Sequence, residues 1–156
     1  MKHHLDTYLP RHFFTTSAVW QSFLLGMVHL LLFITQLFTF EDFPAVIRTW
    51  SMPGGEPMVV FLAVILPLTE LVSLPYLVSM NISPRILTLS RYATLSVGAL
   101  WVIISLWLTI STAIAESGLF GATISIPAGL WMLGYAVFLL VAAVVIVLER
   151  QKLYRR

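Results

Sequence analysis

The sequence predicts an all-α integral membrane protein built as a bundle of four transmembrane helices. Of its 156 residues, 59% are hydrophobic and only 10% are charged, whereas a soluble domain typically has about 25% charged residues. Four apolar runs cover roughly residues 18–40, 58–80, 92–114 and 126–148. At ~1.5 Å of rise per residue, each run can cross a hydrocarbon core of ~30 Å as a helix. The longest gap between runs, residues 41–57, is too short for a soluble domain, so residues 1–156 are expected to form a single membrane domain.

The distribution of positive charge predicts the orientation. Eight of the nine Lys and Arg residues lie before the first run, between the second and third, or after the fourth, and only Arg48 lies on the other side. The positive-inside rule then places both termini in the cytoplasm, and residues 41–57 and 115–125 outside. We expect a protein of the bacterial inner (cytoplasmic) membrane surrounded by lipid. Its net charge of +2 reflects these membrane edges and does not indicate nucleic-acid binding.

The first apolar run is expected to be a retained helix. It is longer than the 7–15 apolar residues of a signal peptide, and no A-x-A cleavage pattern follows it. His29 lies at its centre, and Gln36 follows seven residues later on the same helix face. The histidines that precede this run are interpreted as solvated surface residues, since no further ligand accompanies them; they are His3, His4 and His12.

The outer connection, residues 41–57, is predicted to contain a short helix lying in the membrane interface. Asp42 is a candidate cap, with Pro44 in the first turn. Apolar residues then recur at helical spacing: Phe43, Val46 or Ile47, and Trp50. Such a helix could cover the outer end of the bundle. An irregular loop with aromatic anchors remains an equal alternative.

The second run contains Glu70, the only formally charged side chain inside the four apolar runs. An ionisable group at this depth is costly in hydrocarbon and usually marks a proton, ion or ligand site. Pro67 and Pro75 flank it, and each removes a helical hydrogen bond, which should free the carbonyls of Ala63 and Leu71. A polar, hydrated pocket is therefore expected around Glu70, although kinks that serve packing alone are the alternative.

The third and fourth runs are interpreted mainly as packing surfaces. In the third, a weakly polar stripe favours close helix contact, and Trp101 lies near mid-depth, where it could line a pocket or fill the core. The stripe consists of Ser105, Thr109 and Thr112. The fourth run is expected to begin with Ser125 as cap and Pro127 in the first turn, and to act as scaffold.

A candidate site follows from pairing His29 with Glu70 near the middle of the membrane. Burial disfavours the charged form of both groups, so a neutral pair is plausible, and proton transfer would give an ion pair. Either form could relay a proton or bind a quinone carbonyl, with Gln36 binding a second polar group and Trp101 and Ser105 beside them. The alternative is that the pair only pins two helices together, but intramembrane hydrogen bonds average only ~0.6 kcal/mol.

Several other chemistries are excluded or disfavoured by the sequence. Cysteine is absent, so the chain has no thiol chemistry of its own. A single histidine within the spans cannot supply both axial ligands of a b-type haem, and His29 with Glu70 is too sparse for a closed metal site. No nucleotide-binding or hydrolase motif occurs.

The order of residues resembles the DoxX/MauE group of small four-helix membrane proteins over about residues 20–112. The similarity includes LLGMVHLLLFITQLF, the outer segment FEDFPAVI, and PMVVFLAVILPLTELVSLPYLVSMNISPRILTLSRYATLSVG. Glu70 and Arg85 would occupy the family's central glutamate and inner basic position. Gln36 stands where the family often has lysine, and the cysteines of some redox-maturation relatives are missing. The resemblance implies association with a respiratory or redox system, through quinone, or with the maturation of a periplasmic enzyme.

The leading hypothesis is a small inner-membrane accessory protein, not a complete enzyme, that binds a quinone-like lipid and associates with redox or respiratory subunits. Three alternatives stay open. The first is a module that binds sterol or another lipid, the second is a dimeric proton-coupled small-molecule transporter, and the third is purely structural association with a larger complex.

Overall fold

A computed structural model describes residues 17–111 and 115–154, and this part of the chain confirms the four-helix membrane architecture. Within these residues, four helices are long and apolar enough to cross a membrane. The helices are α2 (Ser17–Phe38), α3 (Phe43–Thr49), α4 (Gly55–Leu77), α5 (Pro84–Ile110) and α6 (Leu130–Tyr154). The predicted surface histidines His3, His4 and His12 lie outside the described residues.

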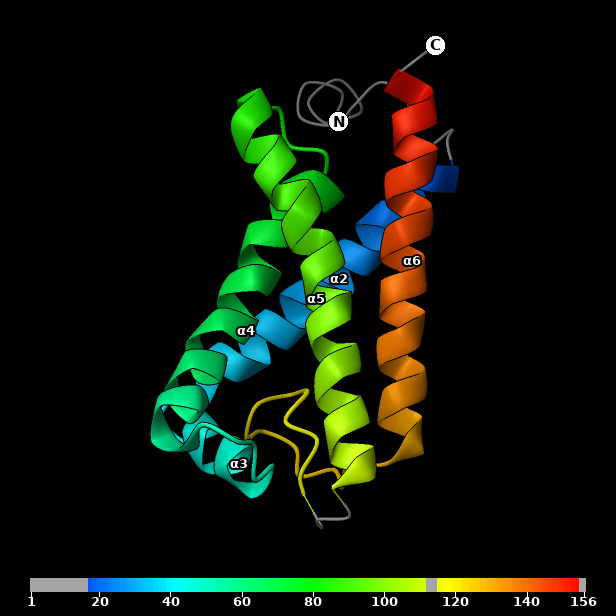
Figure 1. The fold of residues 1–156 in the computed structure, drawn as a ribbon. Coiled ribbons are helices and arrows are strands. Elements are labelled where there is room, and N and C mark those ends of the chain that lie inside the picture. The colour runs from blue at the N-terminus through cyan, green and yellow to red at the C-terminus, as the bar shows by residue number, and fades with distance from the viewer. Residues whose placement is uncertain (1–16, 112–114, 155–156) are drawn as a thin grey trace.

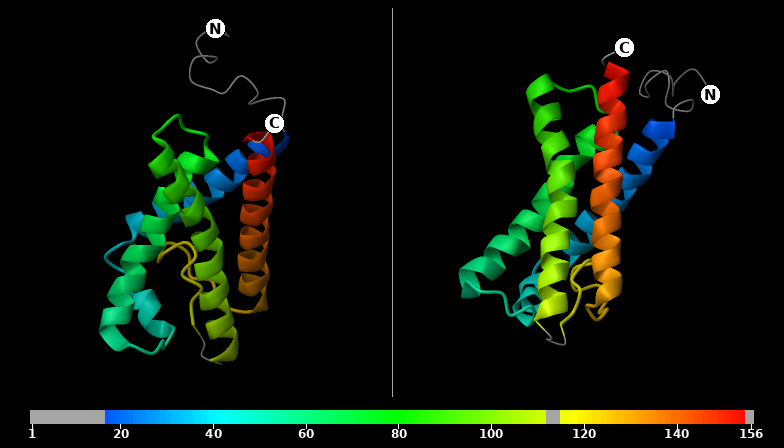
Figure 2. Two further views of the ribbon diagram at one scale, coloured as in Figure 1. Left: turned by 45° about the horizontal axis from the view of Figure 1, so that its top comes forward. Right: turned by 45° about the vertical axis from the view of Figure 1, so that its right-hand side comes forward.

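The four long helices alternate in direction (Figure 1). α2 crosses obliquely behind α4 and α5, while α5 and α6 run nearly side by side (Figures 1 and 2). α4 packs against α2 and α5, α5 also packs against α6, and the α2–α6 contact is smaller. The start of α2, the α4–α5 connection and the end of α6 share one end of the bundle, and α3 and residues 115–129 share the other.

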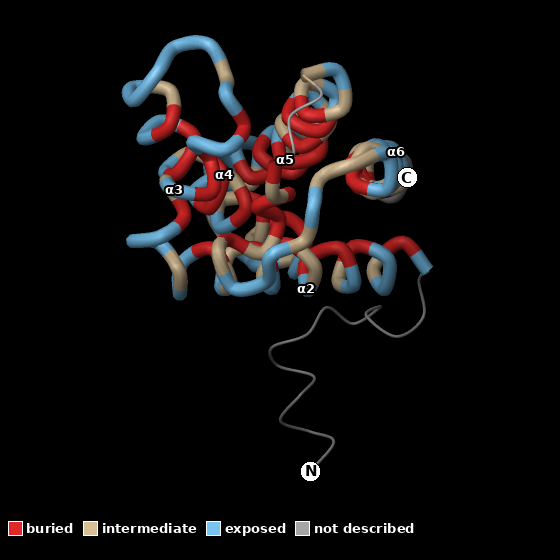
Figure 3. The backbone as a smooth tube through the Cα atoms, turned by 90° about the horizontal axis from the view of Figure 1, so that it is seen from below, coloured by how far each residue is buried: buried red, intermediate tan, exposed pale blue. Residues whose placement is uncertain are grey.

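The buried residues lie on the helix faces that turn toward one another (Figure 3). Their largest members include Trp50, Trp101, Leu32, Leu66 and Leu139. Large apolar side chains also cover the outward faces of all four long helices, among them Leu24, Phe61, Leu106 and Phe138. An apolar surface this extensive on every side of a bundle fits lipid as the surrounding solvent.

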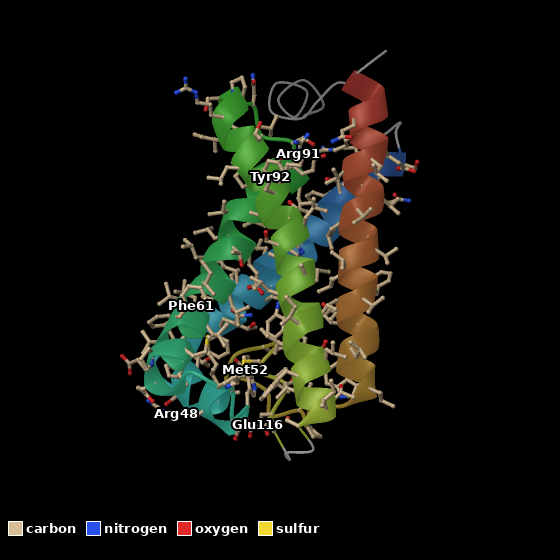
Figure 4. All side chains as sticks on the ribbon, viewed as in Figure 1. Arg48, Met52, Phe61, Arg91, Tyr92 and Glu116 are labelled. Carbon is tan, nitrogen blue, oxygen red and sulfur yellow. The ribbon has the colours of Figure 1, made fainter. Side chains whose placement is uncertain are left out.

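The bounds of α5 differ from the prediction at its beginning. The helix starts at Pro84, about eight residues before the apolar run, and proline suits a first helical turn. Arg85 and Arg91 therefore belong to the helix, and Figure 4 shows Arg91 and Tyr92 at this end of the bundle. The apolar run predicted the part of the helix that crosses the hydrocarbon core. It did not predict the polar turns that precede it, residues 84–91.

The predicted start of α6 is wrong. Ser125 is not a helix cap, because its hydroxyl donates a hydrogen bond to the Glu116 carboxylate at 2.7 Å. Pro127 lies opposite Glu116 in an isolated antiparallel bridge, flanked by backbone hydrogen bonds such as Ser117 N–H to the Ile126 carbonyl at 2.8 Å. These pairings hold residues 115–128 as a folded-back outer segment, so α6 begins only at Leu130.

The short outer helix is confirmed as α3, although Asp42 makes no capping hydrogen bond with its side chain. Trp50 is fully buried and does not lie in the interface. Its indole N–H donates to the Glu116 carbonyl at 2.7 Å, and Trp107 donates to the Trp50 carbonyl at 2.9 Å. α3 is therefore fastened to both the outer segment and α5.

Exposed charges meet at the same end of the bundle. Arg48 donates from Nε to Glu56 at 3.1 Å, and this hydrogen bond raises the pKa of the guanidinium. Figure 4 shows Arg48 and Glu116 at the end opposite Arg91. A pair this exposed contributes little to stability.

Gly98 provides a test of the α5–α6 contact. A Cβ atom at this position would lie 2.6 Å from Leu140 Cα and 2.9 Å from Leu140 N, both of them backbone atoms that cannot rotate away. We expect Gly98→Ala to lower the free energy of unfolding by about 1–3 kcal/mol, which is typical of overpacking. Thermal unfolding in detergent would measure this.

Gly134→Ala is the matched control, because no atom lies within 4 Å of a Cβ at this other mid-helix glycine. Its effect should be neutral or stabilising by up to about 1 kcal/mol, as helix propensity predicts. Equal melting temperatures for the two variants would contradict the close α5–α6 packing.

Candidate functional site

Glu70 lies at the meeting point of three helices. Its side chain is 0% exposed on α4. One carboxyl oxygen, Oε1, accepts two hydrogen bonds, from Gln36 Nε2 of α2 and from Trp101 Nε1 of α5, each at 3.1 Å. Two N–H donors on one oxygen compensate part of the cost of removing a carboxyl group from water.

His29 is linked to Glu70 through Ser73 and not by a direct hydrogen bond. The buried imidazole Nδ1 lies 2.7 Å from Ser73 Oγ. The Ser73 hydroxyl in turn donates to the backbone carbonyl of Glu70 at 2.6 Å. The predicted direct contact between His29 and Glu70 is therefore not formed. Ser73 links them instead, one helical turn from Glu70 on the face of α4 that meets α2.

Three polar atoms of this cluster have no hydrogen-bond partner among the residues that the structure describes. They are Glu70 Oε2, Gln36 Oε1 and His29 Nε2. Each belongs to a side chain with no solvent exposure. Buried polar side-chain atoms nearly always have a partner, in the protein or in ordered water. We call Glu70, Gln36, His29, Ser73 and Trp101 the Glu70 cluster.

The outer segment, residues 115–128, covers the cluster from one side of the membrane. The second Gln36 amide hydrogen goes to the backbone carbonyl of Leu119 at 3.2 Å, and Leu119 is fully buried. Thr39, the residue after the end of α2, accepts from the Ala122 N–H at 2.9 Å. The segment runs inward beside α5, between α3 and α6 (Figures 1 and 2).

Side chains of α5 pair backbone groups of α4 on both sides of Pro75. The Tyr76 N–H donates to Ser90 Oγ at 2.8 Å, and the Ser90 hydroxyl donates to the Ser73 carbonyl at 3.1 Å. Thr94 makes a longer hydrogen bond to the same carbonyl, at 3.5 Å. Side chains of a neighbouring helix thus pair backbone groups next to the proline, as membrane helices require.

The C-terminal end of α4, at the end of the bundle away from the outer segment, is held by α2 and α6. Ser22 of α2 donates to the Leu77 carbonyl at 2.7 Å. Arg150 of α6 donates to the Tyr76 carbonyl and to the Ser79 hydroxyl, and its guanidinium lies 5.0 Å from the centre of the Tyr76 ring. The last two turns of α4 and the turn that follows it, residues 70–79, are therefore anchored to every other long helix.

The structure brings together most of the residues predicted for the site. Gln36 and Trp101 contact Glu70 directly, and His29 contacts it through Ser73. Ser105 is not joined to them, since its buried hydroxyl donates to the Val102 carbonyl of its own helix at 3.1 Å. Pro67 and Pro75 both lie inside a continuous α4.

Sequence reasoning missed two residues that the structure places in or next to the site, Ser73 and Ser90. Ser73 follows Glu70 by three residues and so shares its helix face, a spacing that could have revealed it. Ser90 precedes the third apolar run and gave no such signal.

Comparison of the chain with family models, curated proteins and solved structures gives no match. The resemblance to the DoxX/MauE group therefore stays a prediction from the sequence.

The role of Ser90 can be tested by truncation. Ser90→Ala removes the partner of the Tyr76 N–H and a donor to the Ser73 carbonyl, and we expect it to cost about 1–2 kcal/mol. Ser105→Ala, another buried serine on α5, removes only a hydrogen bond within the helix and should cost less. Chemical or thermal unfolding of both variants measures the difference, and equal costs would argue against the pairing of these backbone groups by α5.

Gly121 tests whether the outer segment is seated on α2. This residue has a φ of 61°, and a Cβ there would lie 2.9 Å from Gln36 Cα. We expect Gly121→Ala to displace the segment, with faster hydrogen–deuterium exchange of residues 115–128. Gly55→Ala is the control, because Gly55 has a φ of 60° and no atom within 4 Å of its Cβ position. Both variants carry roughly 1–2 kcal/mol of backbone strain, so faster exchange of the segment in both would refute a specific contact.

Proposed function

We propose that this chain is a small accessory protein of the inner membrane, which binds a quinone-like lipid at the Glu70 cluster and associates with a redox or respiratory system. The observation that carries the proposal is the set of three unpartnered polar atoms on Glu70, Gln36 and His29. Gln36 is hydrogen-bonded to Glu70, His29 is linked to Glu70 through Ser73, and the other polar side-chain atoms of the three residues are all paired.

Helix pinning alone accounts poorly for this pattern. A cluster that only joins helices is most stabilising when every buried polar atom has a partner, and each one left unpaired costs about 1–3 kcal/mol. Ser22, Ser90 and Thr94 show paired buried hydroxyl groups elsewhere in the same bundle. The unpaired atoms around Glu70 fit a site that is completed by another molecule.

The surroundings favour a lipid-soluble ligand with a polar ring. The cluster is buried between helices whose outward faces are apolar, so a ligand arriving from the bilayer needs an apolar tail. Its head group needs hydrogen-bonding atoms to meet Glu70 and His29. The indole of Trp101 supplies a flat apolar wall beside them. A quinone with a prenyl tail has all of these properties.

The accessory role follows from what a bound quinone requires. Quinone chemistry exchanges electrons, and the sequence has no cysteine with which this chain could exchange them. We therefore assign electron transfer to a partner protein, and to this chain the holding and orientation of the lipid.

Direct binding tests this proposal. The wild-type protein in lipid nanodiscs should bind a short-chain ubiquinone analogue saturably, with one molecule per chain, as measured by equilibrium dialysis with the analogue in both redox states. Glu70→Leu should weaken this binding at least tenfold, because it removes the central polar group of the cluster.

Trp107→Phe is the control for this experiment. It removes an indole N–H that serves only the Trp50 carbonyl at the outer end, so binding should stay within about twofold. The proposal fails if the wild-type protein shows no saturable binding of either redox state, or if Glu70→Leu, folded by circular dichroism, binds as well as wild type.

A further inference from the structure

The amide of Gln36 has a fixed orientation in the Glu70 cluster. One of its Nε2 hydrogens goes to the Leu119 carbonyl, a group that can only accept, so Nε2 and not Oε1 must face it. The other hydrogen goes to Glu70 Oε1. Both donors of the amide are therefore used, and the unpartnered Oε1 needs a donor from elsewhere.

The tautomer of His29 is fixed in a similar way. Ser73 has one hydroxyl hydrogen, and its Oγ lies 2.6 Å from the Glu70 carbonyl oxygen, a separation at which two oxygens require a hydrogen between them. The Ser73 oxygen must then accept from His29 Nδ1–H at 2.7 Å. In the neutral imidazole this leaves Nε2 as a bare acceptor, buried and without a partner.

The third unpartnered atom, Glu70 Oε2, is more adaptable. Oε1 already accepts from Gln36 and Trp101, so an acid proton would reside on Oε2. Oε2 accepts when the carboxyl group is ionised and donates when it is protonated. In either state, at least two of the three unpartnered atoms need a hydrogen-bond donor.

We infer that the Glu70 cluster selects its ligand by hydrogen-bond donors, and hence binds the reduced hydroquinone in preference to the oxidised quinone. This inference rests on the proposed function. Quinone carbonyls only accept, so they could pair with a protonated Glu70 and would leave Gln36 Oε1 and His29 Nε2 without partners. The hydroxyl groups of a hydroquinone donate to both atoms and can still accept from Glu70.

The placement of the two acceptors fits a ring with two donors. His29 and Gln36 are two turns apart on one face of α2, about 10 Å along the helix axis. Ser73 and Glu70 of α4 lie level with them, as their hydrogen bonds show. The two hydroxyls of a hydroquinone project from opposite sides of the ring, so each can approach one acceptor.

The test is the redox dependence of binding to the wild-type protein in nanodiscs. We expect the reduced short-chain ubiquinone analogue to bind at least tenfold more tightly than the oxidised form. Preferential binding of the reduced state raises the midpoint potential of the bound two-electron couple, by about 30 mV for each factor of ten. A redox titration followed by ultraviolet absorbance gives this potential independently of the affinities.

His29→Phe removes the Nε2 acceptor and keeps a flat ring of similar size. It should reduce the preference for the hydroquinone at least fivefold and lower the bound midpoint potential toward that of the free analogue. Trp107→Phe should leave both quantities unchanged.

Equal or tighter binding of the oxidised form, with saturation and dependence on Glu70, would overturn this inference and leave the proposed function intact. No binding of either form would overturn both, and would fit a cluster completed by water. Displacement of the hydroquinone by an equimolar sterol would show that the cluster binds hydroxyl donors in general. It would overturn the inference that hydroquinone is the preferred ligand.

Discussion

The cost of keeping a carboxyl group in a membrane interior organises this bundle. Glu70 is fully buried, and Gln36 and Trp101 of two other helices donate hydrogen bonds to one of its oxygens. These two hydrogen bonds fix the rotation of α2, α4 and α5 relative to one another. Apolar packing alone would not, because lipid tails are as apolar as the leucines that cover the helices.

The same constraint accounts for the detail of α4. A proline five residues after the acid disturbs the helical hydrogen bonds, and Ser90 of α5 pairs the backbone groups on either side of it. Ser73, between the acid and the proline, has its carbonyl bound to α5 and its hydroxyl in contact with His29 of α2. The helix defect is thus the place where three helices are connected, and it lies directly beside the candidate site.

The outer segment belongs to the site as well as to the fold. Its Leu119 carbonyl holds the Gln36 amide in one orientation and so determines that Oε1 is left without a partner. Trp50 fastens the segment to α3, and its ring packs edge-on against Trp101 at 6.5 Å between centroids. The chemistry offered to a ligand in the membrane interior therefore depends on residues 115–128, most of which the sequence presents only as a connection.

The sequence by itself determined the membrane class, the number of long helices and the depth of the polar residues. These follow from hydrophobicity and from a constant rise per residue, both of which are local properties. Only the tertiary structure decided that Glu70 meets Gln36 and Trp101, that His29 meets Ser73, and that residues 125–129 precede α6 instead of starting it. Helix rotation and loop pairing depend on contacts between segments that are far apart in the chain. Some of these contacts are to backbone carbonyls, and because every residue has the same carbonyl group, the sequence does not show which one will be used.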